Sequence, residues 1–324
     1  MEKLTVRRGG TILKQLPANW WLPWLVRART LLVEHRNLLN LINVFPVADA
    51  DTGTNLVATV GRAADTAGLA DEPDFATAAR AALRGARGNS GTLVSVWLLG
   101  LAGELEGLDC PDVAQLHHAL LAGAQRAQSA LSQPAEGTAL TVMSALAAVP
   151  PTENFGGYLA KLVDAAESTV RQSAHAEHAR HGWVDSGALG MLLVTAALYS
   201  AITATEATAD YSDLLVLPPA FEGKKLLDSE VAGAVTQPQV EVMCTMQLPV
   251  YEVTALRSAL DTIGDSVSIA QVYAGHEALW AIHVHVAKER DALRVLEAAG
   301  EPQDVRVTAL DTAEHQERHA GELA

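Results

Sequence analysis

The chain has few cysteines, few aromatic side chains and few basic residues for its length of 324 residues. Its two cysteines, Cys110 and Cys244, cannot form a disulfide framework, which favours a reducing compartment such as the cytoplasm. The chain has 23 Lys and Arg against 38 Asp and Glu, a formal net charge of -15. Such a chain lacks the basic surface that nucleic-acid binding requires, and an anionic membrane surface repels it.

Targeting and membrane-spanning segments are not expected. Residues 1–15 mix charge with glycine and lack the apolar core of a signal peptide. Residues 186–205 contain no charged residue and are long enough to cross a bilayer. They are rich in Ala, Gly, Ser and Thr and lack flanking Lys or Arg anchors, so we interpret them as a buried helix, and residues 92–103 likewise.

Hydrophobic periodicity divides the chain into two parts. Residues 24–204 are rich in Ala and Leu with helical spacing, interrupted by Gly, Pro, Asn and Asp clusters. After a Pro- and Gly-bearing stretch, strand-like runs occur at 240–248, 266–272, 278–286 and 304–310, with helical patterns at 250–263 and 288–299. We therefore predict an all-helical domain at 1–205, a linker at 206–239 and a smaller α+β domain at 240–324.

The most informative motif is N-V-F-P-V-A-D-A-D-T-G-T-N, residues 43–55. It places Asp49 and Asp51 two residues apart in a loop that opens directly into an apolar helix. Carboxylates at this spacing can converge on a hard cation such as Mg²⁺. Unpaired backbone N–H groups at the helix start would bind an anion beside that cation. The loop is therefore predicted to bring metal and phosphate together.

Three further segments repeat this design of a small polar turn followed at once by an apolar helix. They are G-A-R-G-N-S-G from Gly85, E-G-T from Glu136 and D-S-G from Asp185. A single such turn is ordinary helix capping, but four in one domain favour a common site at one end of a helical bundle. The chain has no G-x-x-x-x-G-K-[ST] loop and no G-x-G-x-x-G after a strand, which excludes P-loop and Rossmann sites.

In this order and spacing, the four motifs resemble the ATP-binding domain of the dihydroxyacetone kinase L-subunit family, and most closely its fatty acid kinase (FakA) branch. The resemblance covers residues 24–204. It implies an antiparallel barrel of helices that binds ATP at one end through two Mg²⁺ ions. Asp49 and Asp51 match the metal-binding and catalytic aspartates, and Asn43 lies near a further metal ligand. The implied nucleotide contacts are Thr54, Asn55, Asn89, Ser90, Gly91, Thr138, Asp185, Ser186 and Gly187.

The acidic loop departs from the fatty acid kinase pattern at two positions. Ala48 and Ala50 stand where that pattern has proline and glycine. Alanine between the aspartates also occurs in the dihydroxyacetone branch, so we expect metal binding to survive. The loss of proline before Asp49 costs some loop rigidity.

The second part of the chain carries a candidate metal site. His283 and His285 alternate in A-I-H-V-H-V, so on a strand both imidazoles face one side. Taken alone, such a pair is more often an exposed strand face than a metal site. The region resembles the fatty acid kinase middle domain, which pairs a cysteine with an H-V-H strand to bind zinc. That resemblance implies Cys244, His283 and His285 as Zn²⁺ ligands.

The leading functional prediction is an ATP- and Mg²⁺-dependent kinase. Resemblance to the fatty acid kinase implies a fatty acid, presented by a separate fatty-acid-binding carrier protein, as the phosphate acceptor, with acyl phosphate as product. A homodimer is compatible with the sequence. Two alternatives stay open: a dihydroxyacetone-type kinase subunit, and a regulatory protein that binds ATP without transferring phosphate.

Overall fold

The protein divides into two compact units in a computed structural model. The structure describes residues 7–8, 11–43, 50–66, 74–132, 134–176, 183–205, 211–215, 240–273 and 278–310. The first unit comprises 1–130 with 134–215, and the second comprises 131–133 with 216–324. The predicted linker, 206–239, lies mostly outside the described residues, so its boundaries stay a prediction.

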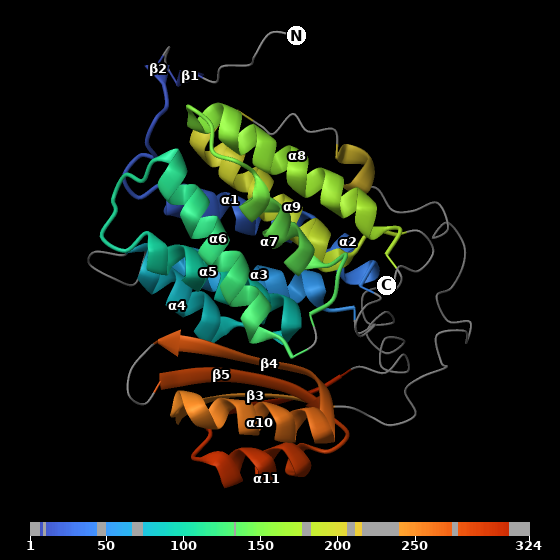
Figure 1. The fold of residues 1–324 in the computed structure, drawn as a ribbon. Coiled ribbons are helices and arrows are strands. Elements are labelled where there is room, and N and C mark those ends of the chain that lie inside the picture. The colour runs from blue at the N-terminus through green and yellow to red at the C-terminus, as the bar shows by residue number, and fades with distance from the viewer. Residues whose placement is uncertain are drawn as a thin grey trace, which may run out of the picture. The chain divides into compact units, whose positions relative to one another are not determined.

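The described part of the first unit is built from α-helices apart from a short hairpin and one 3₁₀ turn (Figure 1). The helices are α1 (Trp21–Glu34), α2 (Arg36–Leu41), α3 (Thr52–Asp65), α4 (Phe75–Gly85), α5 (Gly88–Glu104), α6 (Val113–Ala130), α7 (Ala139–Ala148), α8 (Phe155–Ser173) and α9 (Ser186–Thr203). The hairpin pairs β1 (Arg7–Arg8) with β2 (Thr11–Ile12), and the 3₁₀ turn is η2 (Ser212–Leu215).

These helices close into a ring. From α3 to α9 each helix packs against the next along the chain, and α1 contacts both α9 and α3. The arrangement confirms the predicted helical barrel. Small residues set how closely neighbours approach: a Cβ on Gly100 of α5 would lie 2.8 Å from the backbone nitrogen of Gly123 on α6. Glycine at both positions lets the two backbones pass in contact.

Several aromatic side chains of the first unit lie together in the core of this ring. Trp20 and Trp24 stack with ring centroids 5.6 Å apart, and Phe75 of α4 lies 5.3 Å from Trp20. Trp24 also meets Trp97 of α5 edge to face at 6.1 Å, and its indole N–H donates to the carbonyl of Val194 on α9 at 2.9 Å. Trp24 of α1 is thus fully buried, contacts α5 and α9, and has a hydrogen-bond partner for its only polar atom.

Helix α9 is the uncharged apolar segment that the sequence predicts to be buried. By length and composition it passes as a candidate membrane span, and 83% of that window is buried inside the protein. Its contacts with α1, α3, α7 and α8 account for an apolar surface on all sides. The segment forms the predicted buried helix.

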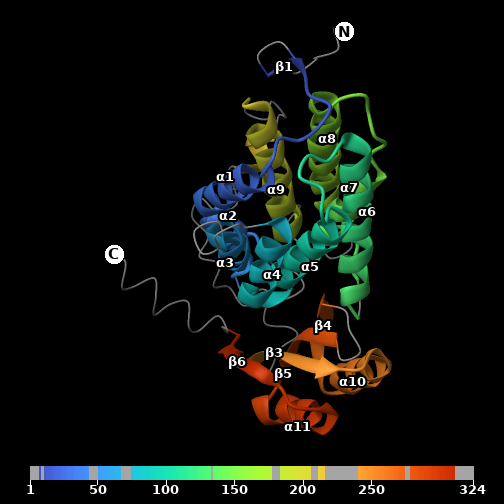
Figure 2. The same ribbon diagram turned by 90° about the vertical axis from the view of Figure 1, so that its left-hand side faces the viewer.

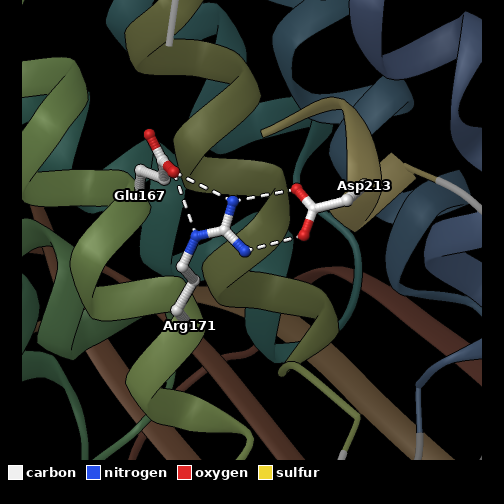
Figure 3. A network of polar contacts seen from close by, with 3 residues as sticks. All are labelled: Glu167, Arg171 and Asp213. Carbon is white, nitrogen blue, oxygen red and sulfur yellow. Dashed lines mark hydrogen bonds and ion pairs between the residues drawn. The ribbon is translucent and has the colours of Figure 1, made fainter. Parts of the chain in front are cut away.

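An ion-pair network ties η2 to α8 (Figure 3). The guanidinium of Arg171 donates to both carboxylate oxygens of Asp213 at 2.8 Å, and its Nε donates to Glu167 Oε1 at 3.0 Å. The network lies at the surface, where solvent screens ion pairs, so it orders the turn more than it stabilises the fold.

The second unit is a four-stranded antiparallel sheet with two helices on one face (Figures 1 and 2). Its elements are β3 (Val240–Leu248), α10 (Val250–Ile263), β4 (Gly264–Tyr273), β5 (Ala278–Val286), α11 (Glu289–Ala299) and β6 (Gln303–Ala309), and the strand order is β4-β5-β3-β6. The helix-covered face is apolar. Its core comes from alternate residues of β3 and β5 packed on Leu256, Leu260 and Leu296. The predicted α+β domain is confirmed.

Candidate functional site

The acidic loop leads directly into α3, as predicted. Asp51 is the N-cap residue of this helix. Asp49 lies outside the described residues, and Asn43 is buried at the other end of the loop, with its N–H bonded to the carbonyl of Asn40 at 3.3 Å. Ala50 has a φ of 54°, in the left-handed region that glycine adopts without strain. This backbone conformation gives a physical reason for the glycine that the fatty acid kinase pattern has here.

The first turn of α3 is capped by another helix rather than by its own N-cap residue. Asn40 of α2 accepts from the Thr54 backbone N–H through Oδ1, and its Nδ2 donates to Thr54 Oγ1, both at 3.0 Å. The Asp51 side chain makes no capping hydrogen bond. Gly53 permits this arrangement, because a Cβ there would meet the Arg36 carbonyl oxygen. Sequence reasoning missed Asn40, since nothing local to Thr54 reveals a partner on a separate helix.

The second motif, at the start of α5, lies against α3. Gly88 has a φ of 59°, and a Cβ on it would collide with the side-chain amide of Asn55. One turn on, a Cβ on Gly91 would lie 2.5 Å from Thr59 Oγ1. Asn55 is buried, and its carbonyl accepts from Thr59 Oγ1 at 2.8 Å. Two of the predicted nucleotide contacts, Asn55 and Gly91, therefore stand on helices in direct contact.

Asn89 offers a buried acceptor at this helix start. Its Oδ1 is shielded from solvent and has no hydrogen-bond partner among the described residues. A buried polar atom without a partner is costly unless a ligand, ion or water satisfies it. Ser90 follows it, half-buried, in the same first turn. Asn89 and Ser90 thus present polar side chains at a helix N-terminus, where ligands are often bound.

The third motif forms a tight turn before α7. Gly137 has a φ of 76°, and its N–H donates to Thr141 Oγ1 at 2.8 Å. The Thr141 hydroxyl donates in turn to Glu136 Oε2 at 3.1 Å. Thr138 turns its hydroxyl back to the Ala135 carbonyl at 2.8 Å and makes no side-chain cap. The Thr138 hydroxyl is therefore not bonded to the first backbone N–H groups of α7.

The fourth motif, at the start of α9, adjoins the first and third. The hydroxyl of Ser186 donates to the Leu39 carbonyl of α2 at 2.7 Å. A Cβ on Gly187 would lie 3.3 Å from the Ala139 side chain at the start of α7. One turn on, a Cβ on Gly190 would overlap the side chain of Leu56 on α3. These approaches join the motifs to one another.

Asp185 differs from an ordinary surface cap. It caps α9 by accepting from the Ala188 N–H at 2.8 Å. Removal from water raises the pKa of this carboxyl to about 7, although hydrogen bonds from Ala188 and Gly187 act in the opposite direction. A nearby cation would lower that pKa and favour the ionised form.

We call the set of four helix starts the rim: residues 51–55, 88–91, 136–139 and 185–187. Packing contacts connect the first start with the second (Gly88 with Asn55) and the third with the fourth (Gly187 with Ala139), and just beyond the rim Gly190 of α9 meets Leu56 of α3. Backbone donors, the buried Asn89 acceptor and acidic side chains are the groups that a metal–polyphosphate ligand requires. Individual roles for these residues stay predictions.

A second polar cluster lies in the second unit, on the sheet face opposite α10 and α11. Glu241 of β3 with His283 and His285 of β5 are all buried, and one ligand atom from each lies within 4.8 Å of the others. In the strand register Glu241 is opposite His285, and Met243 is opposite His283. The prediction that both imidazoles share one face of a strand agrees with this register.

The structure contradicts Cys244 as the third ligand. It pairs with Ile282, on the face that packs against the helices, and lies in the hydrophobic core with 5% exposure. Side chains alternate along a strand, so Cys244 and the histidines point to opposite faces. Burial raises the pKa of its thiol to about 12. Glu241 of β3, and not Cys244, lies beside the two histidines.

Two family models match the chain. The model described as DAK2 domain matches residues 46–200, and the model described as the FakA-like middle domain of fatty acid kinase matches residues 237–318. The first covers the rim and the helices from α3 to α9, and leaves α1 and α2 outside. The second coincides with the sheet that carries the histidine cluster.

Several bacterial proteins are similar in sequence. An uncharacterized protein of Staphylococcus saprophyticus is 28% identical over 286 residues, 83% of this chain and 51% of the relative. Protein YloV of Bacillus subtilis is 24% identical over 296 residues, 85% and 52% of the two chains. An uncharacterized protein of Staphylococcus epidermidis is 32% identical over 174 residues, 50% and 32%. The chain thus spans about half the length, or less, of these relatives.

Among solved structures, the dihydroxyacetone kinase from C. freundii in complex with AMP-PNP and Mg²⁺ aligns with a TM-score of 0.42 and 20% identity, over 62% of this chain and 37% of that one. A likeness of that strength carries no argument about the site. The family models match in chain order, each to one structural unit. The chain therefore carries a segment that matches the DAK2 domain, followed by a segment that matches the FakA-like fatty acid kinase middle domain.

Proposed function

We propose that this protein is an ATP- and Mg²⁺-dependent kinase whose acceptor is a fatty acid presented by a separate fatty-acid-binding carrier protein, with acyl phosphate as product. The observation that carries the kinase part is the rim, where four motif-bearing helix starts lie in contact. The acceptor part is supported by the match to the fatty acid kinase middle domain. A cytoplasmic location, where ATP is abundant, belongs to the same proposal.

The residues of the rim fit a magnesium-bound nucleotide. Asn89 Oδ1 is a buried oxygen without a partner among the described residues, and a hard cation or a donor group of the nucleotide would satisfy it. Gly88 and Gly91 leave room for the chain to approach its neighbours at distances that a Cβ would block. Neutral oxygens and amides predominate at the rim, so charge neutralisation of a polyphosphate falls to the metal.

In the proposed complex each motif has its own role. Asp49 and Asp51 hold Mg²⁺, which neutralises phosphate charge when bound, with Asn43 beside them. Thr54, Asn55, Asn89, Ser90, Gly91 and Thr138 orient the phosphates and ribose, and Asp185, Ser186 and Gly187 border the adenosine. The chain's own residues thus act by positioning and by electrostatic stabilisation, the two main sources of catalysis in phosphoryl transfer.

The test is ATP-dependent acyl phosphate formation with a fatty-acid-loaded carrier protein, detected by trapping the product with hydroxylamine. Asp51→Asn should reduce the rate by about a hundredfold or more, because a metal ligand is lost. Asp65→Asn is the matched control on the same helix: Asp65 forms a surface ion pair with Arg29 and lies at the other end of α3. Equal rates for the two variants would exclude the rim as the reaction site.

The same assay separates the two alternatives. Phosphorylation of dihydroxyacetone held by a separate subunit, with no acyl phosphate, would identify the dihydroxyacetone-type kinase. Tight Mg-ATP binding that Asp51→Asn weakens, with no transfer to either acceptor, would identify a regulatory ATP-binding protein. The change of Ala48 and Ala50 from the fatty acid kinase pattern is the feature that keeps the second alternative open.

A further inference from the structure

The second helix start of the rim departs from the ordinary chemistry of a helix start. Arg87 is the N-cap residue of α5 and makes no side-chain capping hydrogen bond. An N-cap side chain normally accepts from the first backbone N–H groups, as Asp74, Asn154 and Asp185 do at α4, α8 and α9. A guanidinium has five donors and no acceptor, so Arg87 cannot cap a helix.

The charge of Arg87 is also unfavourable for its position. The N-terminus of a helix carries a partial positive charge, so it repels a cation and attracts an anion. Arg84, three residues earlier, lies in the last turn of α4, where the negative end of the helix favours a cation. Residues that break a local rule in this way are expected at functional sites. An anion bound beside Arg87 and the start of α5 would remove the conflict.

No side chain in the described part of the chain supplies that anion. Arg87 is exposed and has no side-chain hydrogen bond or ion pair with a described residue, whereas Arg29 and Arg171 each pair with a carboxylate. The chain has 38 Asp and Glu against 23 Lys and Arg, so carboxylate partners are abundant. The guanidinium of Arg87 is therefore available to a ligand.

The backbone of Arg87 is held at the edge of the rim. Its carbonyl accepts from the Gly91 N–H at 3.2 Å, and a Cβ on the next residue, Gly88, would collide with the side chain of Asn55. Two residues on, the buried Oδ1 of Asn89 has no partner among the described residues, which independently indicates a ligand at this turn. Arg87 is also the only Lys or Arg in the four motifs.

We propose that Arg87 is a catalytic residue whose guanidinium binds the γ-phosphate of ATP and neutralises charge on the phosphoryl group during its transfer. This inference rests on the proposed function. In that reaction an oxygen of the fatty acid carboxylate attacks the γ-phosphorus. The bond from the γ-phosphorus to the β–γ bridging oxygen breaks, and ADP leaves with the electron pair of that bond. The step needs neither a proton transfer nor a redox partner.

The chemistry of the acceptor explains why a fixed cation is useful here. A carboxylate is already anionic and needs no general base, but it must approach a phosphate of the same sign. A guanidinium is permanently charged, and its planar fork can bind two phosphate oxygens at once. It can therefore remain on the phosphoryl group as that group passes from the nucleotide to the acceptor.

The first experiment measures the binding of Mg-ATP and of Mg-ADP to the full-length chain by calorimetry, without an acceptor. Arg87→Gln should weaken Mg-ATP binding by about tenfold, because a hydrogen-bonded charge is lost, and should leave Mg-ADP binding unchanged. Arg84→Gln removes the same charge three residues earlier and is the matched control. It should change neither affinity by more than about twofold.

Three results of the binding experiment would overturn the inference. They are equal weakening of ATP and ADP by Arg87→Gln, weakening of neither nucleotide, and the same ATP-selective loss in Arg84→Gln. A wild-type chain that binds neither nucleotide would overturn both this inference and the proposed function.

The second experiment measures acyl phosphate formation with the loaded carrier protein. Arg87→Gln should lower kcat by about a thousandfold, whereas Arg87→Lys, which keeps the charge but loses the fork, should lower it by about tenfold to a hundredfold. Arg84→Gln should leave kcat unchanged. An unchanged kcat in Arg87→Gln would overturn the catalytic role. If the wild type forms no acyl phosphate, the proposed acceptor fails, and the comparison of ATP with ADP still decides whether Arg87 contacts the γ-phosphate.

Thermal unfolding separates this role from a structural one. Arg87→Gln removes a cation from the positive end of α5, so the midpoint of unfolding should rise or stay the same. Arg84→Gln removes a cation from the negative end of α4, so its midpoint should fall slightly. A marked fall in the midpoint of Arg87→Gln would show that Arg87 supports the fold, and the inference would be rejected.

Discussion

Asp51 and Asp185 occupy the same position, the N-cap, of two helices that both contribute to the rim, yet their side chains do different work. Asp185 accepts from the third N–H of α9, as Asp74 does at the start of α4. In α3 the equivalent N–H is bound by Asn40 of a neighbouring helix. The cap of α3 is therefore supplied from outside, and Asp51 stays at the helix start without a capping role.

This difference shows how a helix start becomes specialised. A carboxylate that caps its own helix has one oxygen bonded to the backbone. Where a residue of another helix supplies the cap, as Asn40 does, we call it a borrowed cap; one residue then supports the helix and another can bind the ligand. The arrangement depends on close packing of α2 against α3, since Asn40 reaches Thr54 only where Gly53 leaves room. Four substitutions test it, in order of decreasing expected effect.

Replacement of Gly53 by alanine should have the largest effect. The new Cβ would meet the Arg36 carbonyl oxygen and lie 2.8 Å from Asn40 Oδ1, so the cap of α3 would be displaced. We expect a loss of about 2–3 kcal/mol in the free energy of unfolding, measured by chemical denaturation. Gly61→Ala on the same helix is the control. Its Cβ would lie 3.4 Å from a flexible Arg29 methylene, and it should be neutral or stabilising by up to about 1 kcal/mol.

Asp185→Asn tests the cost of the half-buried carboxylate. The folded-state pKa of about 7 lies above the unfolded value, so the stability contributed by the protonated form is lost as the pH rises from about 4 to 7. Asparagine can still accept from Ala188 but does not ionise. Between about pH 5 and pH 8, the free energy of unfolding of the variant should rise by on the order of 2 kcal/mol relative to that of the wild type. A pH-independent difference between the two proteins would contradict a raised pKa.

Asn40→Ala removes the borrowed cap itself. Two hydrogen bonds to Thr54 are lost, so the free energy of unfolding should fall by about 1–2 kcal/mol, and Mg-ATP should bind more weakly. Asn37→Ala, on the exposed side of the same helix, controls for helix propensity. Calorimetric titration with Mg-ATP and denaturation measure the two effects. Equal stability of both variants would show that the hydrogen bonds of Asn40 do not stabilise α3.

Asp74→Ala provides the reference for an ordinary surface cap. Its hydrogen bonds with Thr77 lower the pKa of Asp74, so its contribution is present above the unfolded pKa and is lost as the pH falls through the lower folded value. We expect a cost of about 1 kcal/mol near neutral pH that disappears in acid. Asp74→Asn keeps the cap and should cost less. This pH dependence is opposite in sign to that of Asp185.

The helical ring and the α+β unit could be predicted because their signals are local. The apolar spacing in α4 and α8 and the alternation in β3 and β5 follow from helix and strand periods alone. The four motifs were also visible, since each lies within a few residues of a helix start. Asn40 was not visible, because a residue on α2 serves Thr54 fourteen positions away and leaves no pattern around either one.

The amino-acid sequence by itself determined that His283 and His285 share a strand face, because side chains alternate with a period of two. It did not determine which residue of β3 joins them. Cys244 and Glu241 stand three positions apart and therefore point to opposite faces, and only the pairing register of β3 with β5 decides which one meets the histidines. Register depends on how the sheet packs against α10 and α11, which is a property of the folded structure.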